Sequence, residues 1–130
     1  MENEKLKCLL VKPNELPIEI EIEGKLEEYQ KLVGGYIETT YISNVDDVVL
    51  ICNDESKLNG MRPNRDIGHD IIFGPFIVIG DDYDNAVFKS LTEQQILDNK
   101  IRFDKHSIER TENKMTAILM NKNINSREER

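Results

Sequence analysis

The chain has 130 residues, about the length of one ordinary domain, so it has no room for a second catalytic lobe. Hydrophobic residues make up 38% and charged residues 32%, which is polar but still sufficient for one apolar core. The formal net charge is -8, and a negative field disfavours general binding to DNA or RNA.

The N-terminus carries no sign of a targeting segment, because charged and polar residues follow Met1 and the longest apolar runs are only a few residues. We therefore expect neither a signal peptide nor a membrane-spanning helix, and a location in the host cell cytoplasm. Cys8 and Cys52 each lie in an apolar run, which predicts buried free thiols. A disulfide between adjacent strands is the alternative.

The first part of the chain alternates strand and helix signals. Residues 6–12 are apolar and end at a proline, and residues 18–22 alternate isoleucine with glutamate, which predicts a strand with isoleucines toward the core. Apolar residues then recur at helical spacing over Lys25 to Val33. Gly34-Gly35 follows and predicts the end of that helix.

The middle of the chain is typical of short strands. Residues 36–42 and 48–52 are rich in β-branched and aromatic residues, so they predict a hairpin whose turn is 43–47. Residues 53–68 predict a long irregular loop. Three more short strands are expected at 71–73, 76–79 and 86–89.

A second helix is expected from about Leu91 to Phe103, because Ser90 and Glu93 have the spacing of a capping box. Apolar residues share helical spacing further on, so part of the C-terminal tail is predicted to be helical and to fray from Asn121. The fold class is therefore α+β. A single domain over residues 1–103 combines a mostly antiparallel sheet of five or six strands with two helices, and residues 104–130 form a helical or frayed tail.

No motif supports metal binding, a cofactor or catalysis. Asp81, Asp82 and Asp84 resemble a calcium loop, but Val87 stands where the sharp turn needs glycine. The two histidines are isolated, and no glycine-rich loop has a phosphate-binding or dinucleotide signature. We therefore predict no metal ligands, no cofactor and no catalytic residues.

Basic and amide side chains concentrate at Arg62, Asn64 and Arg65, with His69 close by. Two arginines and an asparagine can hold a phosphate or a carboxylate by forked hydrogen bonds, and we predict a ligand site formed with the turn Gly34-Gly35-Tyr36. The alternative is that the arginines form surface salt bridges with nearby carboxylates, namely Asp54, Glu55, Asp66 or Asp70.

Three tyrosines, Tyr29, Tyr36 and Tyr41, have side chains on which a base could stack. Tyr29 lies at helical spacing and the other two lie in a predicted strand, so packing within the fold is the more common role for such residues.

Five segments, in chain order, resemble the small phage and plasmid proteins of domain of unknown function family 3846: VKPNELP, LVGGYIETTYI, LICNDESKLNGMRPNRD, FGPFIVIGDD and SLTEQQI. The resemblance covers roughly Lys7 to Phe103. Its more specific parts are the segments LVGGYIE and N-E-x-x-K-x-x-G-x-x-x-N-R. The second segment is matched by Asn53, Glu55, Lys57, Gly60, Asn64 and Arg65, with Lys57 one position earlier than the pattern places its lysine. It implies an intracellular accessory protein of a mobile element, with counter-defence as its role, and it supplies no activity or catalytic residues.

Three functions from different classes follow. The first is a non-enzymatic binder that sequesters a small phosphorylated ligand, such as a nucleotide immune signal; replacing Arg62 and Arg65 with alanine should then abolish uptake and leave the melting temperature nearly unchanged. The second is an acidic inhibitor that covers the nucleic-acid-binding surface of a host defence protein, using Glu19, Glu21, Glu23, Asp46, Asp47, Asp81, Asp82 and Asp84. The third is a small enzyme. The two-sided strands and the C-terminal tail also suggest a homo-oligomer.

Overall fold

The structure is a computed structural model that describes residues 5–42, 45 and 47–128. Within these residues it holds a six-stranded sheet, a two-stranded hairpin and three helices, which confirms the α+β class. The elements in order are β1 (Leu6–Val11), β2 (Ile18–Ile22), α1 (Leu26–Val33), β3 (Ile37–Thr40), β4 (Val48–Asn53), β5 (Pro63–Asp66), β6 (Ile71–Phe73), β7 (Phe76–Asp82), β8 (Val87–Lys89), α2 (Glu93–Arg102) and α3 (Lys105–Glu128).

The main sheet is antiparallel and has the order β2-β1-β7-β4-β3, with β8 paired to the far end of β7. The predicted hairpin of β3 and β4 is confirmed, with Ile37 opposite Asn53 and Thr40 opposite Leu50. Its predicted turn, 43–47, includes residues outside the described part of the chain. Strands β5 and β6 form the separate two-stranded sheet.

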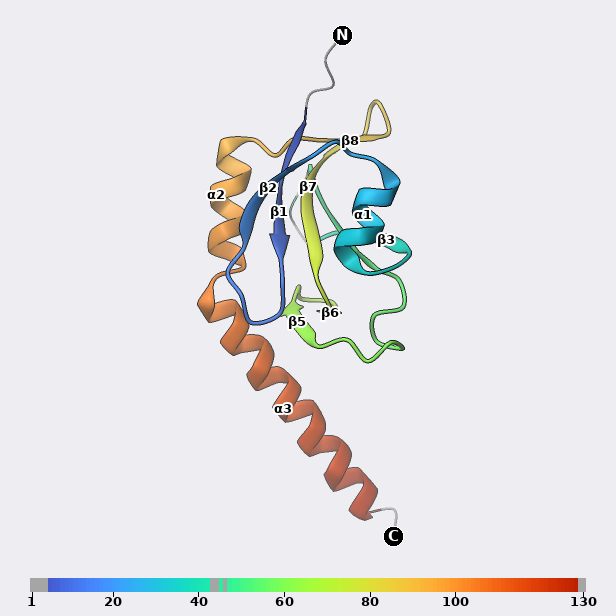
Figure 1. Cartoon of the computed structure of the whole chain (residues 1–130). Helices are drawn as coiled ribbons and strands as arrows, with labels where there is room; N and C mark the ends of the chain where they lie inside the picture. Colours follow the sequence, from blue (N-terminus) through green and yellow to red (C-terminus); the bar gives the residue numbers. More distant parts are fainter. Residues whose placement is uncertain (1–4, 43–44, 46, 129–130) are drawn as a thin grey trace.

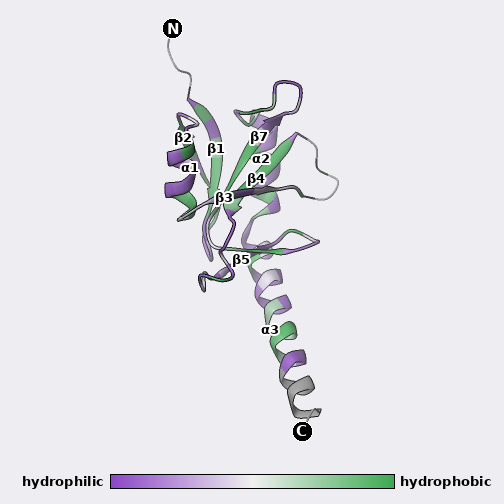
Figure 2. Ribbon diagram, turned by 90° about the vertical axis from the view of Figure 1, so that its right-hand side faces the viewer, coloured by the Kyte–Doolittle hydropathy of each residue, from purple (hydrophilic) through white to green (hydrophobic). Residues whose placement is uncertain are grey.

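Alternation along the central strands builds two cores, one on each face of the sheet. Leu9 and Val78 point to one face, where Phe103 at the end of α2 packs, and Cys8 and Ile77 point to the other, where α1 packs. Figure 1 shows α2 and α1 on opposite sides of the strands. In Figure 2 the central strands β1, β4 and β7 carry most of the hydrophobic colour.

Three local predictions are corrected. The isoleucines of β2 are not all in the core, because α1 packs against β4, β7 and β3 and leaves Ile18 exposed at the sheet edge. The N-cap of α2 is Thr92 with Gln95, since the Ser90 hydroxyl instead accepts a hydrogen bond from the Lys7 amide. The expected irregular loop contains β5, which pairs with β6.

The tail is a single helix, α3, that extends away from the body (Figure 1). Its first turns pack against β5. The predicted fraying from Asn121 is wrong, since the helix continues to Glu128 and neither glycine nor proline interrupts it. No helix in the described part of the chain is long and apolar enough to cross a membrane.

Candidate functional site

Arg65 lies inside the protein, with a side chain that is 0% exposed. Its guanidinium donates from Nε to Ser107 Oγ at 2.7 Å, from Nη1 to Asn64 Oδ1 at 2.7 Å, and from Nη2 to the main-chain oxygens of Glu15 at 2.7 Å and Phe103 at 3.0 Å. Burial lowers the pKa of Arg65 to about 10, which still leaves it charged at neutral pH. Arg65 is therefore an internal hydrogen-bond centre.

The Asn64 side chain is also buried and hydrogen-bonded within the protein. Its Nδ2 donates to the main-chain oxygens of Val11 at 2.9 Å and Gly74 at 2.8 Å. The structure thus places Asn64 and Arg65, two of the three predicted side-chain donors, in the interior, bonded to the protein itself. The alternative of surface salt bridges does not hold for Arg65 either, since no ion pair of this residue is found among the described residues.

Two of the carboxylates that the sequence suggested as salt-bridge partners of the arginines form ion pairs with lysines instead. Asp66 contacts Lys114 at 3.2 Å and Asp70 contacts Lys57 at 2.8 Å. Local sequence spacing could not reveal the pair of Asp66 and Lys114, because Lys114 is in α3 and reaches β5 only in the folded chain.

The other predicted site residues are distributed over two places. Arg62 is exposed and lines, together with Asn64, a hollow against α3. Gly34 ends α1 in the left-handed conformation, Gly35 lies close to Asn53, and Tyr36 is 70% exposed. The structure therefore brings Arg62 and Asn64 to one hollow, and neither Arg65 nor the turn Gly34-Gly35-Tyr36 lines it.

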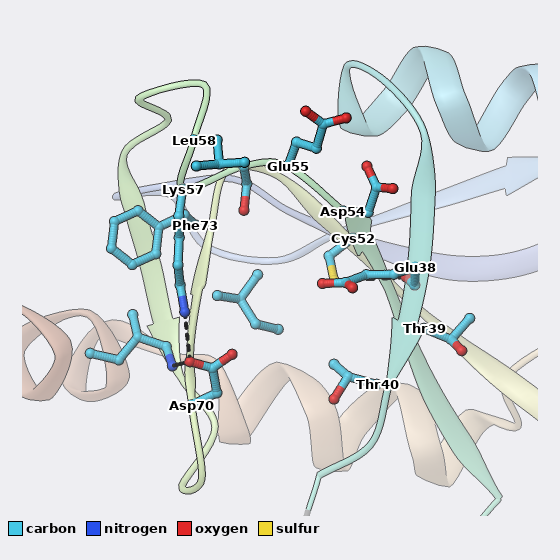
Figure 3. Close-up of a pocket in the computed structure, with 13 residues that line it drawn as sticks. Glu38, Thr39, Thr40, Cys52, Asp54, Glu55, Lys57, Leu58, Asp70 and Phe73 are labelled. Carbon is cyan, nitrogen blue, oxygen red and sulfur yellow. Dashed lines mark hydrogen bonds and ion pairs between the residues drawn. The ribbon is translucent and has the colours of Figure 1, made fainter.

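One hollow of about 200 Å³ lies between β3, β4, the β4–β5 loop and β6. We call it the acidic pocket, and Figure 3 shows Glu38 and Cys52 on one wall facing Lys57 and Asp70 on the other. Lys57 Nζ bonds Asp70 Oδ1 at 2.8 Å and lies 5.5 Å from the centre of the Phe73 ring. Burial alone would raise the pKa of Asp70, but hydrogen bonds from Lys57 and from the Ile71 amide lower it.

The thiol in this pocket is not poised for nucleophilic chemistry. Burial, together with the charge of Glu38, raises the pKa of Cys52 to about 12. A thiol needs to ionise in order to attack, so Cys52 is unreactive at neutral pH. Cys8 is also buried and its pKa is likewise raised to about 12 by burial. Both cysteines are free, as predicted.

A larger hollow of about 610 Å³ lies over the opposite face of the sheet, next to α1 and β8. We call it the tyrosine pocket. It is lined mostly by apolar and aromatic side chains, with one carboxylate: Leu6, Gly24, Leu26, Tyr29, Ile37, Tyr41, Asp81, Tyr83, Ala86, Val87 and Phe88. A concave, mainly apolar cavity with a few polar groups is the usual form of a small-molecule site.

Tyr29 has an unusual environment in this pocket. Its side chain is 3% exposed and its ring packs edge-on against Phe88, with centroids 5.6 Å apart. The hydroxyl has no hydrogen-bond partner in the described part of the chain. Burial raises the pKa of Tyr29 to about 12, so the hydroxyl keeps its proton. Buried polar groups without partners are rare in folded proteins.

Gly24 packs closely against Leu6 and this hydroxyl. Its φ of +82° favours glycine, and a Cβ there would lie 3.5 Å from Tyr29 Oη and 2.9 Å from Leu6 Cδ1. A larger residue at this position would therefore crowd Leu6 and narrow the pocket next to the hydroxyl.

Asp81 and two more tyrosines form another part of the wall. Asp81 is 9% exposed, and its Oδ2 accepts a hydrogen bond of 3.2 Å from the Tyr41 hydroxyl. The rings of Tyr41 and Tyr83 are stacked, 6.4 Å apart with 21° between their planes. Burial, followed by the bond to Asp81, raises the pKa of Tyr41.

Sequence reasoning weighed Tyr29 and Tyr41 as stacking or packing residues, and the structure brings both to one pocket. It missed Tyr83, and it assigned Asp81 to an acidic outer face although the side chain is buried. No local signal marks this group, since Tyr29 is in α1, Tyr41 directly follows β3, Asp81 is in β7 and Tyr83 directly follows β7.

Within the described residues, no group of histidine, cysteine and carboxylate side chains has the arrangement of a metal site. Among known proteins, the sequence profile described as Domain of unknown function (DUF3846) matches residues 6–104. Searches of curated proteins and of solved structures found no match.

Proposed function

Because the chain belongs to a family described only as a domain of unknown function (DUF3846), we propose its function from its own geometry: it is a non-enzymatic protein that binds a small organic molecule in the tyrosine pocket. The observation that carries this proposal is the buried Tyr29 hydroxyl, which has no partner among the described residues. Leaving such a group unbonded costs about 1–3 kcal/mol. A ligand that supplies the missing hydrogen bond recovers part of that cost.

The size and chemistry of the pocket support the same proposal. Its volume of about 610 Å³ is in the range of drug-sized ligand sites. Leu26, Tyr83 and Val87 are exposed at the pocket, so apolar surface is available for a ligand to cover.

A binding role fits the protein's reactive groups better than catalysis. Both thiols are held protonated by burial, and the Tyr29 hydroxyl is hydrogen-bonded to no base among the described residues. A binder acts by removing its ligand from solution. Sequestration of a host signal in counter-defence, which the family resemblance suggests, is the biological role that we propose for it.

Native mass spectrometry tests the proposal directly. The purified protein is incubated with a small-molecule extract of the cells that produce it, and its mass is compared with that of the untreated protein. We expect a retained mass of small-molecule size for the natural chain and its loss for Tyr29→Phe.

Tyr36→Phe is the matched control, because it removes the same hydroxyl from a side chain that is 70% exposed and does not line the pocket. A retained mass that is equal in natural chain and both variants, or the absence of any retained mass, would overturn the proposal.

A second candidate, the acidic inhibitor, is favoured by the acidic pocket. Glu38, Asp54 and Glu55 all line this hollow and are exposed, and Lys57 is already paired with Asp70. A lysine or arginine side chain of a host protein fits such a surface. Of the carboxylates first assigned to this role, Asp81 is buried, Glu19 pairs with Lys100, and Asp46 lies outside the described residues.

The inhibitor is tested by capturing host proteins on the immobilised chain and eluting them with increasing salt. We expect elution at moderate salt and loss of capture by the double variant Glu38→Gln, Asp54→Asn. Capture that is insensitive both to salt and to the double variant would refute this candidate.

A further inference from the structure

We infer that the ligand of the tyrosine pocket is an organic cation with a flat ring, that is, a protonated amine carried on an aromatic or heteroaromatic body. The inference rests on the proposed function and names its ligand class. It departs from the expectation of a phosphorylated ligand, and it depends on Asp81, the stacked tyrosines and the polar group at Tyr29.

Asp81 is the first observation. Asp81 is more than nine-tenths buried and lines the pocket, and its carboxylate accepts a hydrogen bond from the Tyr41 hydroxyl at 3.2 Å. No ion pair of Asp81 occurs among the described residues, and none of the described lining residues is lysine, arginine or histidine. Buried charges are normally paired, so the wall of the pocket has an uncompensated negative charge that a cationic ligand would balance.

The aromatic rings are the second observation. Tyr41 and Tyr83 are stacked beside Asp81, and both line the pocket. The faces of tyrosine rings attract cations as well as flat rings, by about 0.5–2 kcal/mol for a cation. The carboxylate and the ring faces therefore favour the same kind of ligand.

Tyr29 and Gly24 complete the description of the ligand. The Tyr29 hydroxyl offers a hydrogen bond in an otherwise apolar part of the pocket, and Gly24, which has no side chain, lets the backbone pack close to Leu6 and to this hydroxyl. We therefore expect a polar atom on the ligand's ring system to contact Tyr29, in addition to the amine that contacts Asp81.

A phosphorylated ligand is disfavoured in this pocket. Its negative charge would lie near the Asp81 carboxylate with no lining cation to offset the repulsion. Of the phosphate-binding donors predicted from the sequence, Asn64 and Arg65 are bonded inside the protein, and Arg62 does not line this pocket.

Three indoles with the same ring and different charge test the inference: tryptamine, a cation; tryptophol, its neutral alcohol analogue; and indole-3-acetate, an anion. The chain contains no tryptophan, so the fluorescence anisotropy of the indole reports binding without a protein tryptophan background. We expect tryptamine to bind at least about 10-fold more tightly than tryptophol, since hydrogen bonds between charged groups are the strong ones, and indole-3-acetate to bind most weakly.

Asp81→Asn removes the charge and keeps an oxygen that accepts the Tyr41 hydrogen bond. We expect this variant to bind tryptamine and tryptophol about equally. Asp98→Asn is the matched control, because Asp98 is exposed on α2, over the opposite face of the sheet, and its change to amide leaves the pocket untouched. We expect it to keep the preference of the natural chain.

The outcomes separate the two proposals. Equal affinity of the natural chain for tryptamine and tryptophol, a comparison that needs no variant, would overturn the cation inference while the binding function stands. Retention of the preference by a folded Asp81→Asn variant would overturn it as well. Failure of all three indoles to bind at their solubility limits would count against both the inference and the proposed pocket function.

Discussion

Arg65 Nε donates a buried hydrogen bond of 2.7 Å to Ser107 Oγ, which joins β5 to the first turn of α3. The same guanidinium reaches the main-chain oxygens of Glu15, in the β1–β2 connection, and Phe103, at the end of α2. Three parts of the chain that are distant in the sequence therefore meet at one side chain: β5, the β1–β2 connection and the junction of α2 and α3. Such a network is strong only while every member is bonded.

Replacing Arg65 with methionine should destabilise the protein strongly. The change leaves several buried acceptors without donors, and we expect a loss of about 3–5 kcal/mol in the free energy of unfolding. Urea denaturation followed by circular dichroism measures it. This expectation is opposite to that of the sequence-based ligand hypothesis, in which changing Arg62 and Arg65 leaves the melting temperature nearly unchanged.

Arg62→Met is the control for that experiment, because Arg62 is exposed and removed from the network. Its effect should stay within roughly 0.5 kcal/mol. An Arg65→Met protein as stable as Arg62→Met would contradict the structural role of Arg65.

Replacing Thr111 with valine should loosen α3 from the body. The Thr111 hydroxyl accepts a 2.9 Å bond from the Asp66 amide and donates a 2.8 Å bond to the Ser107 carbonyl. Valine has nearly the same shape but neither bond, so we expect a loss of about 1–3 kcal/mol and faster hydrogen exchange in the first turns of α3. Thr116→Val, on an exposed part of the same helix, should change neither quantity.

Replacing Tyr29 with phenylalanine should keep or raise stability. The hydroxyl is buried without a partner in the described part of the chain, so its removal ends a desolvation cost of about 1–3 kcal/mol while the ring stays on Phe88. Thermal and urea unfolding measure the change. A clear loss of stability would show that the hydroxyl is bonded in solution. A gain in stability together with a loss of ligand would identify a residue retained for binding.

Stability should decline in alkaline solution. The pKa values of the Cys8 and Cys52 thiols rise from 9.0 to about 12 in the fold. Because the folded value is the higher one, the thiols contribute stability that is fully present below pH 9.0 and is lost as the pH rises toward about 12. Tyr29, whose pKa rises from 10.0 to about 12, acts in the same direction.

Urea unfolding across this pH window measures the decline. Cys8→Val should reduce the slope above pH 9.0, since it removes one of the titrating groups from the core. If the stability of Cys8→Val declined with pH as steeply as that of the natural chain, the contribution of the Cys8 thiol to the alkaline decline would be contradicted. In the native state both thiols should also react far more slowly with a thiol reagent than they do in denaturant.

Much of the fold follows from local patterns in the sequence. The runs rich in β-branched and aromatic residues predict β3 and β4, whose pairing is confirmed. The helical spacing that ends at Gly34 predicts α1, and the glycine has the left-handed conformation expected of a helix end. These features are decided by neighbours within a few residues, so one sequence is enough to predict them.

Tertiary structure alone decided the rest. Arg65 belongs to a polar, basic stretch that suggested an exposed ligand loop, yet its donors meet oxygens of Glu15 and Phe103 that only the folded chain brings near. The tyrosine pocket likewise combines Tyr29 with Asp81, far apart in the sequence. The sequence by itself determined where most of the strands and helices form, because backbone preference and hydrophobic period are local, whereas β5 forms only by pairing with β6. Which polar groups end up buried, paired or open to a ligand depends on distant segments, and only their packing decided it.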